Sequence, residues 1–168
     1  MPLLFNQKFM SNVTEKTLVL IKPDAIQRSL VGVITERFER KGLKLVAMKM
    51  MSLDEAILRE HYAHIADKPF FPGVSKFMQS TPVVAMCWEG LGVVDAVRKI
   101  TGITKAREAE GGSIRGDFAM SVSCNVIHAS DTVENAEKEV KRFFKPDEVH
   151  NYDKSEYMHV YADDERAV

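Results

Sequence analysis

The chain has 168 residues, of which 45% are apolar and 28% charged, and its formal net charge is −1. This composition is typical of one globular domain with a sizeable core, and the near-neutral charge argues against a general surface for nucleic acid or membrane. No apolar run is long enough to cross a bilayer, so we expect a cytoplasmic location. Cys87 and Cys124 lie in apolar runs and form no disulfide or zinc pattern, which predicts two buried free thiols.

The first half of the chain begins with residues 1–15, which we expect to form a flexible arm ahead of one domain over residues 16–168. Thr17–Lys22 is apolar on both faces and predicts a strand in the middle of a sheet. Val31–Lys41 has the spacing of an amphipathic helix, and Leu43–Met51 predicts a second strand.

The middle of the chain alternates in the same way. Ser52-Leu53-Asp54-Glu55 predicts a capped helix start, and this helix is expected to run to about Ile65. Further elements are predicted in order: a short helix ending near Gln79, a strand over Pro82–Trp88, a helix near Val93–Ile100 and a polar loop over Thr101–Ser113.

The last quarter predicts a strand over Phe118–Ile127 and a helix over Asp131–Phe144, with Ser130 and Asp131 as caps and Asp131–Glu134 as a capping box. The tail after Pro146 is expected to lie on the surface. This order favours a four-stranded antiparallel sheet with helices on one face, a ferredoxin-like α+β sandwich. A doubly wound parallel sheet is disfavoured, because only four strands are predicted and the glycine-rich phosphate loops are missing.

A histidine, His128, lies between the last predicted strand and the last predicted helix. The N-terminus of a helix offers free N–H groups and a positive dipole end, which stabilise a phosphate, and the imidazole is a nitrogen nucleophile. Lys22, Arg98 and Arg115 are candidate cations for the charge of a transferring group. Together these features suggest phosphoryl transfer through a phosphohistidine.

Eleven segments of the chain, in order, resemble nucleoside diphosphate kinases over roughly residues 17–146. They include Ile21-Lys22-Pro23-Asp24, His61-Tyr62, Lys68-Pro69-Phe70-Phe71-Pro72-Gly73, Ile114-Arg115-Gly116-Asp117-Phe118 and Asn125-Val126-Ile127-His128-Ala129-Ser130-Asp131. The resemblance implies the same ferredoxin-like fold and a ping-pong reaction, in which the γ-phosphate of a nucleoside triphosphate passes to a nucleoside diphosphate through His128.

The resemblance also implies roles for individual residues. Glu139, which by itself reads as a solvated helix charge, would hydrogen-bond the second ring nitrogen of His128, and Tyr62 would lie near that histidine. Residues matching the phosphate and ribose positions are Lys22, Arg98, Thr104, Arg115 and Asn125. Phe70 and Val122 would sandwich the base, although Phe70 on its own reads as a core residue.

Partners and cofactor follow from the same resemblance. It implies Mg²⁺ carried by nucleotide phosphates and water, with no protein metal ligand assigned, and a homo-oligomer, with a hexamer favoured over a tetramer. His61 and His64 have a spacing that suits a metal, but no third ligand accompanies them, so we expect surface or packing roles. The chain departs from the family pattern at His64, at Lys105-Ala106 and at Ala129.

One conflict concerns the last strand. Strict alternation from Phe118 places Asn125 and His128 on opposite faces, yet the resemblance requires both at one site. Either the strand breaks near residues 123–125 or Asn125 reaches the site from a loop; we predict the break.

Two other function classes remain. The same fold serves as a catalytically silent module that binds nucleotide or protein, but such a module has no need of a nucleophile, three cations and an orienting carboxylate. Nucleic-acid binding across the sheet is weaker, since the strands lack paired exposed aromatic residues.

Overall fold

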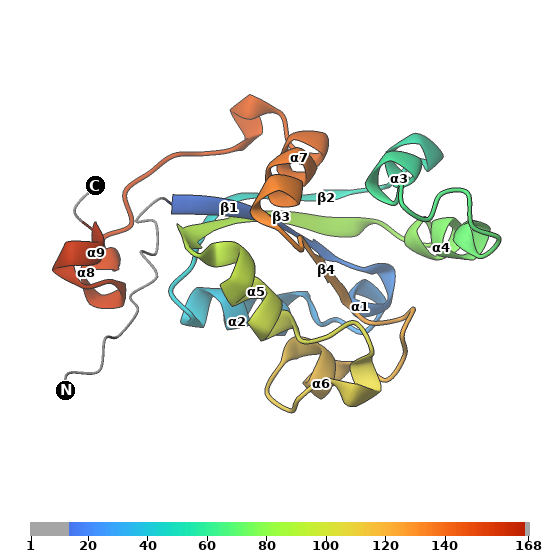
Figure 1. The fold of residues 1–168 in the computed structure, drawn as a ribbon, viewed down its shortest axis with the longest axis horizontal. Coiled ribbons are helices and arrows are strands. Elements are labelled where there is room, and N and C mark those ends of the chain that lie inside the picture. Colours follow the sequence, from blue (N-terminus) through green and yellow to red (C-terminus); the bar gives the residue numbers. More distant parts are fainter. Residues whose placement is uncertain (1–13, 167–168) are drawn as a thin grey trace, which may run out of the picture.

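Within residues 14–166 the sheet has four strands in the order β2-β3-β1-β4, and every neighbouring pair is antiparallel (Figure 1). The structure is a computed structural model that describes residues 14–166. The strand order and the packed helices confirm the expected ferredoxin-like α+β class. Of the predicted arm, residues 1–13 lie outside the described residues, while residues 14 and 15 belong to β1.

The elements follow one another with short connections. The strands are β1 Thr14–Ile21, β2 Lys44–Met51, β3 Val83–Leu91 and β4 Ile127–Ala129. The helices are α1 Pro23–Gln27, α2 Val31–Arg40, α3 Glu55–His61, α4 Phe71–Met78, α5 Val93–Thr101, α6 Ile114–Phe118, α7 Val133–Phe143, α8 Tyr157–Val160 and α9 Asp163–Arg166, with 3-10 turns η1 Ala106–Glu108 and η2 Pro146–Glu148.

Helices cover both faces of the sheet, which corrects the expectation that they lie on one face. Leu18 and Leu20 of β1 pack in one core cluster with residues of α3, α4 and α7, and Val19 and Ile21 pack in the other with α2 and α5. Figure 1 shows α7 on one side of β1 and α2 and α5 on the other. A strand that is apolar on both faces needs a cover on each side to remove its side chains from water.

The last strand is much shorter than predicted. Phe118 ends helix α6, residues 119–126 are irregular, and β4 begins only at Ile127. The hydroxyl of Ser121 accepts hydrogen bonds from the N–H groups of residues 123 and 124, which forms a local turn in place of a ladder. The chain therefore does break ahead of His128, and Cys124 is exposed, not buried as predicted; Cys87 is buried.

Helix α7 begins two residues later than predicted. Its N-cap is Thr132, whose hydroxyl accepts from the N–H of Asn135, so the predicted caps and the Asp131–Glu134 capping box are wrong. Ser130 is fully buried instead, and its hydroxyl accepts from the N–H of Leu18 in β1. Asp131 accepts from the side chain of Asn135. Sequence spacing alone did not show which of these neighbouring hydroxyl and carboxylate groups caps the helix.

Helix α3 is shorter than expected at its C-terminal end. It is capped by Asp54, whose carboxylate accepts from the N–H of Ile57, and Ser52 lies outside the cap. The helix ends at His61, with Tyr62 as the C-cap, and not near Ile65. This early end places His61 and Tyr62 beside the sheet, where they line the cavity described below.

The C-terminal tail lies on the surface, as predicted, along the open edge of β2. The N–H of His150 donates to the carbonyl of Val46 at 2.8 Å, and the Tyr152 hydroxyl donates to the carbonyl of Leu45 at 2.7 Å. Lys154 donates to the carbonyl of Leu43 at 3.0 Å. These contacts occupy backbone groups that an edge strand otherwise leaves free.

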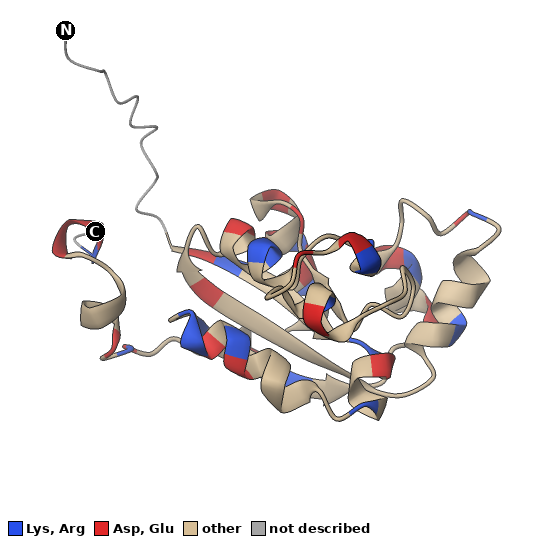
Figure 2. Ribbon diagram, turned by 90° about the horizontal axis from the view of Figure 1, so that it is seen from below, with Lys and Arg blue, Asp and Glu red and all other residues tan. Residues whose placement is uncertain are grey.

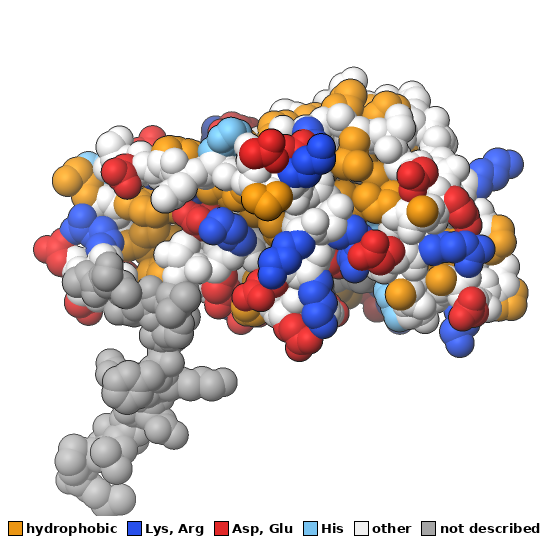
Figure 3. Space-filling model, turned by 90° about the horizontal axis from the view of Figure 1, so that it is seen from above, with side chains coloured by type: hydrophobic (Ala, Val, Ile, Leu, Met, Phe, Trp, Pro, Cys, Tyr) orange, Lys and Arg blue, Asp and Glu red, His pale blue; other side chains and the backbone are white. Residues whose placement is uncertain are grey.

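The surface carries both signs of charge in close mixture. Figure 2 shows acidic and basic residues interspersed along the helices, and Figure 3 shows the same mixture on the opposite side. Any recognition of anions must therefore come from a local arrangement of cations. In residues 14–166 no helix combines the length and hydropathy that crossing a bilayer requires.

Candidate active site

His128 is the central residue of β4 and pairs with Leu20 of β1. Its side chain is about one-fifth exposed and lines a cavity of about 680 Å³. Ile127 and Ala129 on either side are buried in the core beneath α5, so the short strand fixes the backbone of His128 firmly. The imidazole is held by the sheet yet open to a molecule in the cavity.

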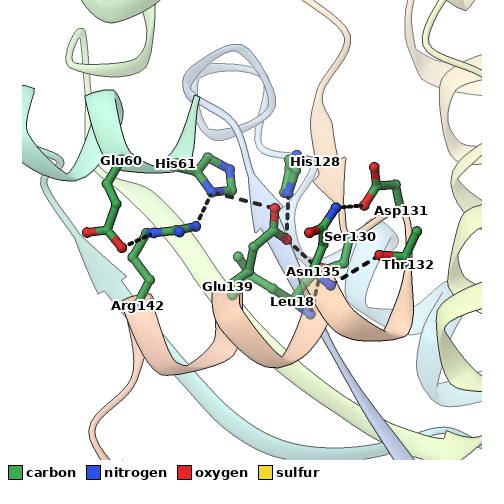
Figure 4. Close-up of polar contacts among 10 residues, drawn as sticks. All are labelled: Leu18, Glu60, His61, His128, Ser130, Asp131, Thr132, Asn135, Glu139 and Arg142. Atoms are coloured by element: carbon green, nitrogen blue, oxygen red, sulfur yellow. Dashed lines mark hydrogen bonds and ion pairs between the residues drawn. The ribbon is translucent and has the colours of Figure 1, made fainter. Parts of the chain in front are cut away.

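Glu139 of α7 fixes the orientation of this imidazole (Figure 4). Its Oε2 lies 3.1 Å from Nε2 of His128 and accepts a 2.6 Å hydrogen bond from the Ser130 hydroxyl. Burial raises the pKa of Glu139, but the hydrogen bonds from His128 and Ser130 outweigh it, so the pKa lies below its usual value. An ionised carboxylate only accepts, so Nε2 carries the proton and Nδ1 keeps a free lone pair.

Nδ1 of His128 is the available nucleophile. Within residues 14–166 no group hydrogen-bonds to it. A neutral imidazole with one nitrogen held and the other free is the arrangement that a histidine nucleophile requires.

Among the described residues five cations line the same cavity: Lys22, Arg98, Arg115, Lys138 and Arg142. The three that the sequence suggested come from different places in the fold. Lys22 follows β1, Arg98 lies on α5 and Arg115 lies on α6. Burial and the nearby Arg115 lower the pKa of Lys22 to about 8, against the opposing charge of Asp24. Burial and Arg98 lower the pKa of Arg115 to about 10. The structure thus brings together the three cations that the sequence suggested.

Arg115 has a structural task in addition to its charge. Its guanidinium donates to the carbonyls of Gly102 at 2.7 Å and Ile127 at 2.6 Å, and to that of Asn125 at 3.4 Å. The side chain therefore ties β4 to the end of α5, and its positive charge faces the cavity from a fixed position.

Asn125 connects the cations to the irregular segment ahead of β4. Its side-chain oxygen lies 2.6 Å from Nζ of Lys22, and its amide nitrogen donates to the carbonyls of Thr104 and Val122. Thr104 and Asn125 both line the cavity, as does Tyr62, whose pKa burial raises to about 12. All three predicted residues therefore lie beside His128.

The two residues predicted to hold the base lie elsewhere. Phe70 is 58% exposed and Val122 is 53% exposed, and neither lines the cavity around His128. The exposed position of Phe70 excludes the core role that two adjacent phenylalanines between prolines suggested; the buried ring is that of Phe71.

His61, for which the sequence predicted a surface or packing role, is buried against His128 and Glu139. Its ring centroid lies 4.4 Å from that of His128, and its Nδ1 lies 3.7 Å from Oε1 of Glu139 and 3.5 Å from Nη1 of Arg142 (Figure 4). Burial and the neighbouring His128 lower the pKa of His61 to about 3, so this ring is neutral. The only sequence signal for this role was the His61-Tyr62 pair at a helix end. His64 is exposed.

His61, His128 and Glu139 have ligand atoms within 4.8 Å of one another, a distance compatible with a metal ion. Arg142 faces Nδ1 of His61, and among the described residues four further cations line the cavity: Lys22, Arg98, Arg115 and Lys138. Positive charge around a site opposes the binding of a metal cation there. We therefore assign this cluster to hydrogen bonding and packing.

A histidine with one free ring nitrogen, oriented by a carboxylate in a cavity lined by several cations, is the arrangement of a phosphotransferase, here on a ferredoxin-like α+β fold. Comparison with known proteins identifies the family. The sequence profile of nucleoside diphosphate kinase matches residues 15–149. The chain is 50% identical over 151 residues to a nucleoside diphosphate kinase of Parabacteroides distasonis, covering 90% of this chain and 99% of the relative. It is 52% identical over 139 residues to nucleoside diphosphate kinase A of Canis lupus familiaris, covering 83% of this chain and 91% of the relative.

Comparison with solved structures identifies the same family. A halophilic nucleoside diphosphate kinase of Halobacterium salinarum in complex with CDP superposes with a TM-score of 0.87 and 43% identity, covering 89% of this chain and 100% of that one. A family member from Babesia bovis gives a TM-score of 0.85 at 37% identity, covering 88% of this chain and 99% of that one. The chain belongs to the nucleoside diphosphate kinase family and is a phosphotransferase, as the sequence predicted. The general reaction of this family is ping-pong transfer of a terminal phosphate through a phosphohistidine.

Proposed function

We propose that Nδ1 of His128 is the atom that carries the phosphate. In the first half-reaction its lone pair attacks the γ-phosphorus of a nucleoside triphosphate, and the bond from that phosphorus to the bridging oxygen breaks. The nucleoside diphosphate leaves with the electron pair of that bond. In the second half-reaction a terminal oxygen of another diphosphate attacks the phosphorus, and the lone pair returns to Nδ1.

The surrounding groups stabilise this transfer. The negative charge of Glu139 favours the positive charge that develops on the imidazole, and Ser130 holds the carboxylate in place. Lys22, Arg98 and Arg115 neutralise charge on the phosphates. Thr104, Asn125 and Tyr62 line the same wall and position the phosphates and the ribose. The observation that carries the proposal is the free Nδ1 of His128 in a cavity lined by cations, among them Lys22, Arg98 and Arg115.

Phe70 and Val122, which lie outside the lining of this cavity, are proposed to hold the base. An exposed ring and an apolar side chain contact the flat face of a base and form no hydrogen bond to its edges. Such contacts accept any nucleoside. The CDP complex of the halophilic relative supports a nucleoside diphosphate as the acceptor.

The family requires a divalent cation, and we propose Mg²⁺. Mg²⁺ prefers oxygen ligands and keeps several waters. In the described cavity the carboxylates of Glu60, Asp131 and Glu139 already accept hydrogen bonds from side chains of the protein. The ion is therefore proposed to arrive with the nucleotide, held by phosphate oxygens and water. We further propose a cytoplasmic homo-oligomer, with a hexamer favoured over a tetramer, which light scattering on the purified protein tests.

The proposal is tested by incubating the protein with Mg²⁺ and γ-labelled ATP. We expect one phosphate per chain, labile to acid and stable to alkali, which ADP removes. His128→Ala is expected to take up no label, whereas His159→Ala in α8 serves as a matched control and labels normally. Retention of label by His128→Ala would move the nucleophile elsewhere. An unlabelled wild type would favour the silent binding module.

A further inference from the structure

The backbone ahead of His128 contains a three-residue turn, Asn125-Val126-Ile127. Val126 has φ +64°, and the N–H of Ile127 donates to the carbonyl of Asn125 at 2.8 Å. A positive φ is rare for any residue with a side chain and is an outlier for a β-branched one. The three-residue turn with a positive central φ is itself strained. Valine adopts this conformation only where its surroundings enforce it.

The segment that follows β1 supplies two contacts that hold this turn. The N–H of Lys22 donates to the carbonyl of Val126 at 2.9 Å, and the N–H of Val126 donates to Oδ2 of Asp24 at 3.0 Å. Both backbone polar groups of Val126 are therefore bound by residues 22–24. Val126 is fully buried, so water cannot replace either partner.

The turn decides which side chains reach the cavity. In a regular strand Asn125 and His128 would point to opposite faces. In the structure both line the cavity, with the Asn125 oxygen 2.6 Å from Nζ of Lys22 and His128 bound to Glu139. The positive φ at Val126 interrupts the alternation just between them and resolves the conflict that the sequence posed.

We propose that Asp24 is a positioning residue for the phosphotransfer reaction: its carboxylate holds the Val126 turn and thereby places Asn125 and His128 on one wall of the cavity. This inference rests on the proposed role of His128. Asp24 does not line the cavity, so its effect on the positions of Asn125 and His128 passes through the turn. Its second oxygen, Oδ1, is buried and has no hydrogen-bond partner among the described residues, so binding the N–H of Val126 is the polar contact that explains its position.

The first test compares Asp24→Ala with Asp24→Asn by the rate of phosphoenzyme formation from saturating γ-labelled ATP. Loss of the acceptor in Asp24→Ala is expected to slow this step about 10- to 100-fold, because small misplacements of reacting groups cost this much. Asn offers a carbonyl oxygen to the same N–H, and Oδ1 has no hydrogen bond to lose, so Asp24→Asn is expected to stay within about 3-fold of the wild type. Loss of the negative charge of Asp24 near Lys22 is expected to change the KM for ATP.

The second test removes the need for the carboxylate. Glycine adopts a positive φ freely, whereas alanine does not. Val126→Gly in the Asp24→Ala background is expected to label about 5-fold faster than Val126→Ala in that background. The alanine variant is the matched control, because both substitutions remove the same valine from the core. Circular dichroism and gel filtration identify the folded variants. If Asp24→Ala alone does not fold, the comparison of the glycine and alanine double variants decides whether the turn needs the carboxylate.

Three results would overturn the proposal: a normal rate in Asp24→Ala, an Asp24→Asn variant as slow as Asp24→Ala, or equal rates for the glycine and alanine double variants. Failure of the proposed function is recognised separately in the same experiment. In that case the wild type itself takes up no phosphate. A labelled wild type together with unaffected Asp24 variants rejects only the role of Asp24.

Discussion

The phosphate end and the base end of the site are built in opposite ways. At the phosphate end, Arg115 and Asn125 are buried, and their hydrogen bonds join three segments of the chain. Phe70 and Val122, which we propose as the base end, are more than half exposed. Phosphoryl transfer depends on fixed distances and charges, whereas stacking on a base tolerates movement. The contrast suits an enzyme that performs one reaction on many nucleosides.

Removal of Glu139 should have the largest effect on the phosphate end. Without this carboxylate the tautomer and the orientation of His128 are no longer fixed. Glu139→Ala is expected to lower kcat by about 10²- to 10⁴-fold, in line with loss of the orienting carboxylate in catalytic triads. Glu137→Ala, an exposed change on the same helix, is the control for steady-state assays. A kcat within about threefold of the wild type would remove Glu139 from the mechanism.

Arg115→Lys tests the rigidity of the phosphate end. Lysine keeps the charge but cannot donate to the carbonyls of Gly102, Asn125 and Ile127 together. The free energy of unfolding is expected to fall by about 2–4 kcal/mol, since buried carbonyls lose their donors. Urea unfolding measures this change, with exposed Arg107→Lys as control. Equal stability of the two variants would show that the carbonyls find other partners.

The pH dependence tests Lys22, whose pKa is lowered to about 8 by burial. Above that pH its ammonium loses its proton, so KM for ADP is expected to rise about 5- to 20-fold between about pH 7.5 and pH 9.5. The folded protein binds fewer protons than the unfolded chain between pH 8 and 10.5, so the contribution of Lys22 to stability rises with pH in this window. Lys22→Met should abolish the KM shift, and exposed Lys41→Met should retain it. A KM that is flat over this range would place the Lys22 titration outside it.

The smallest effect is expected at the base end. Phe70→Ala removes the stacking ring and should raise KM about 3- to 10-fold, with kcat unchanged. Because the ring is 58% exposed, thermal unfolding should not shift. The increase should be similar for ADP, GDP, CDP and UDP. An increase confined to one base would mean that this end reads base edges after all.

Much of the fold follows from local patterns. The doubly apolar strand near residues 17–22, the amphipathic helices and the helix after His128 lie close to the predicted positions. The cations Lys22, Arg98 and Arg115 were found because they follow or flank these elements. Family resemblance added Thr104, Asn125 and Tyr62, which the structure places in the same cavity.

Other features depend on contacts between distant segments. The N-cap is Thr132 and not its neighbours, because Ser130 hydrogen-bonds to β1 and to Glu139. His61 joins the site only because α3 packs against α7. Each of these outcomes is a competition between similar polar groups that local spacing leaves undecided.

By itself, the sequence determined the element order, the sheet with packed helices and the nucleophilic histidine, since hydrophobic periodicity and residue chemistry are local properties. Only the tertiary structure decided that helices cover both faces of the sheet and that Val126 takes a positive φ. Long-range burial and hydrogen bonds from residues 22–24 and Arg115 enforce that backbone against its local preference. In the proposed mechanism the position of the His128 imidazole depends on this enforced turn.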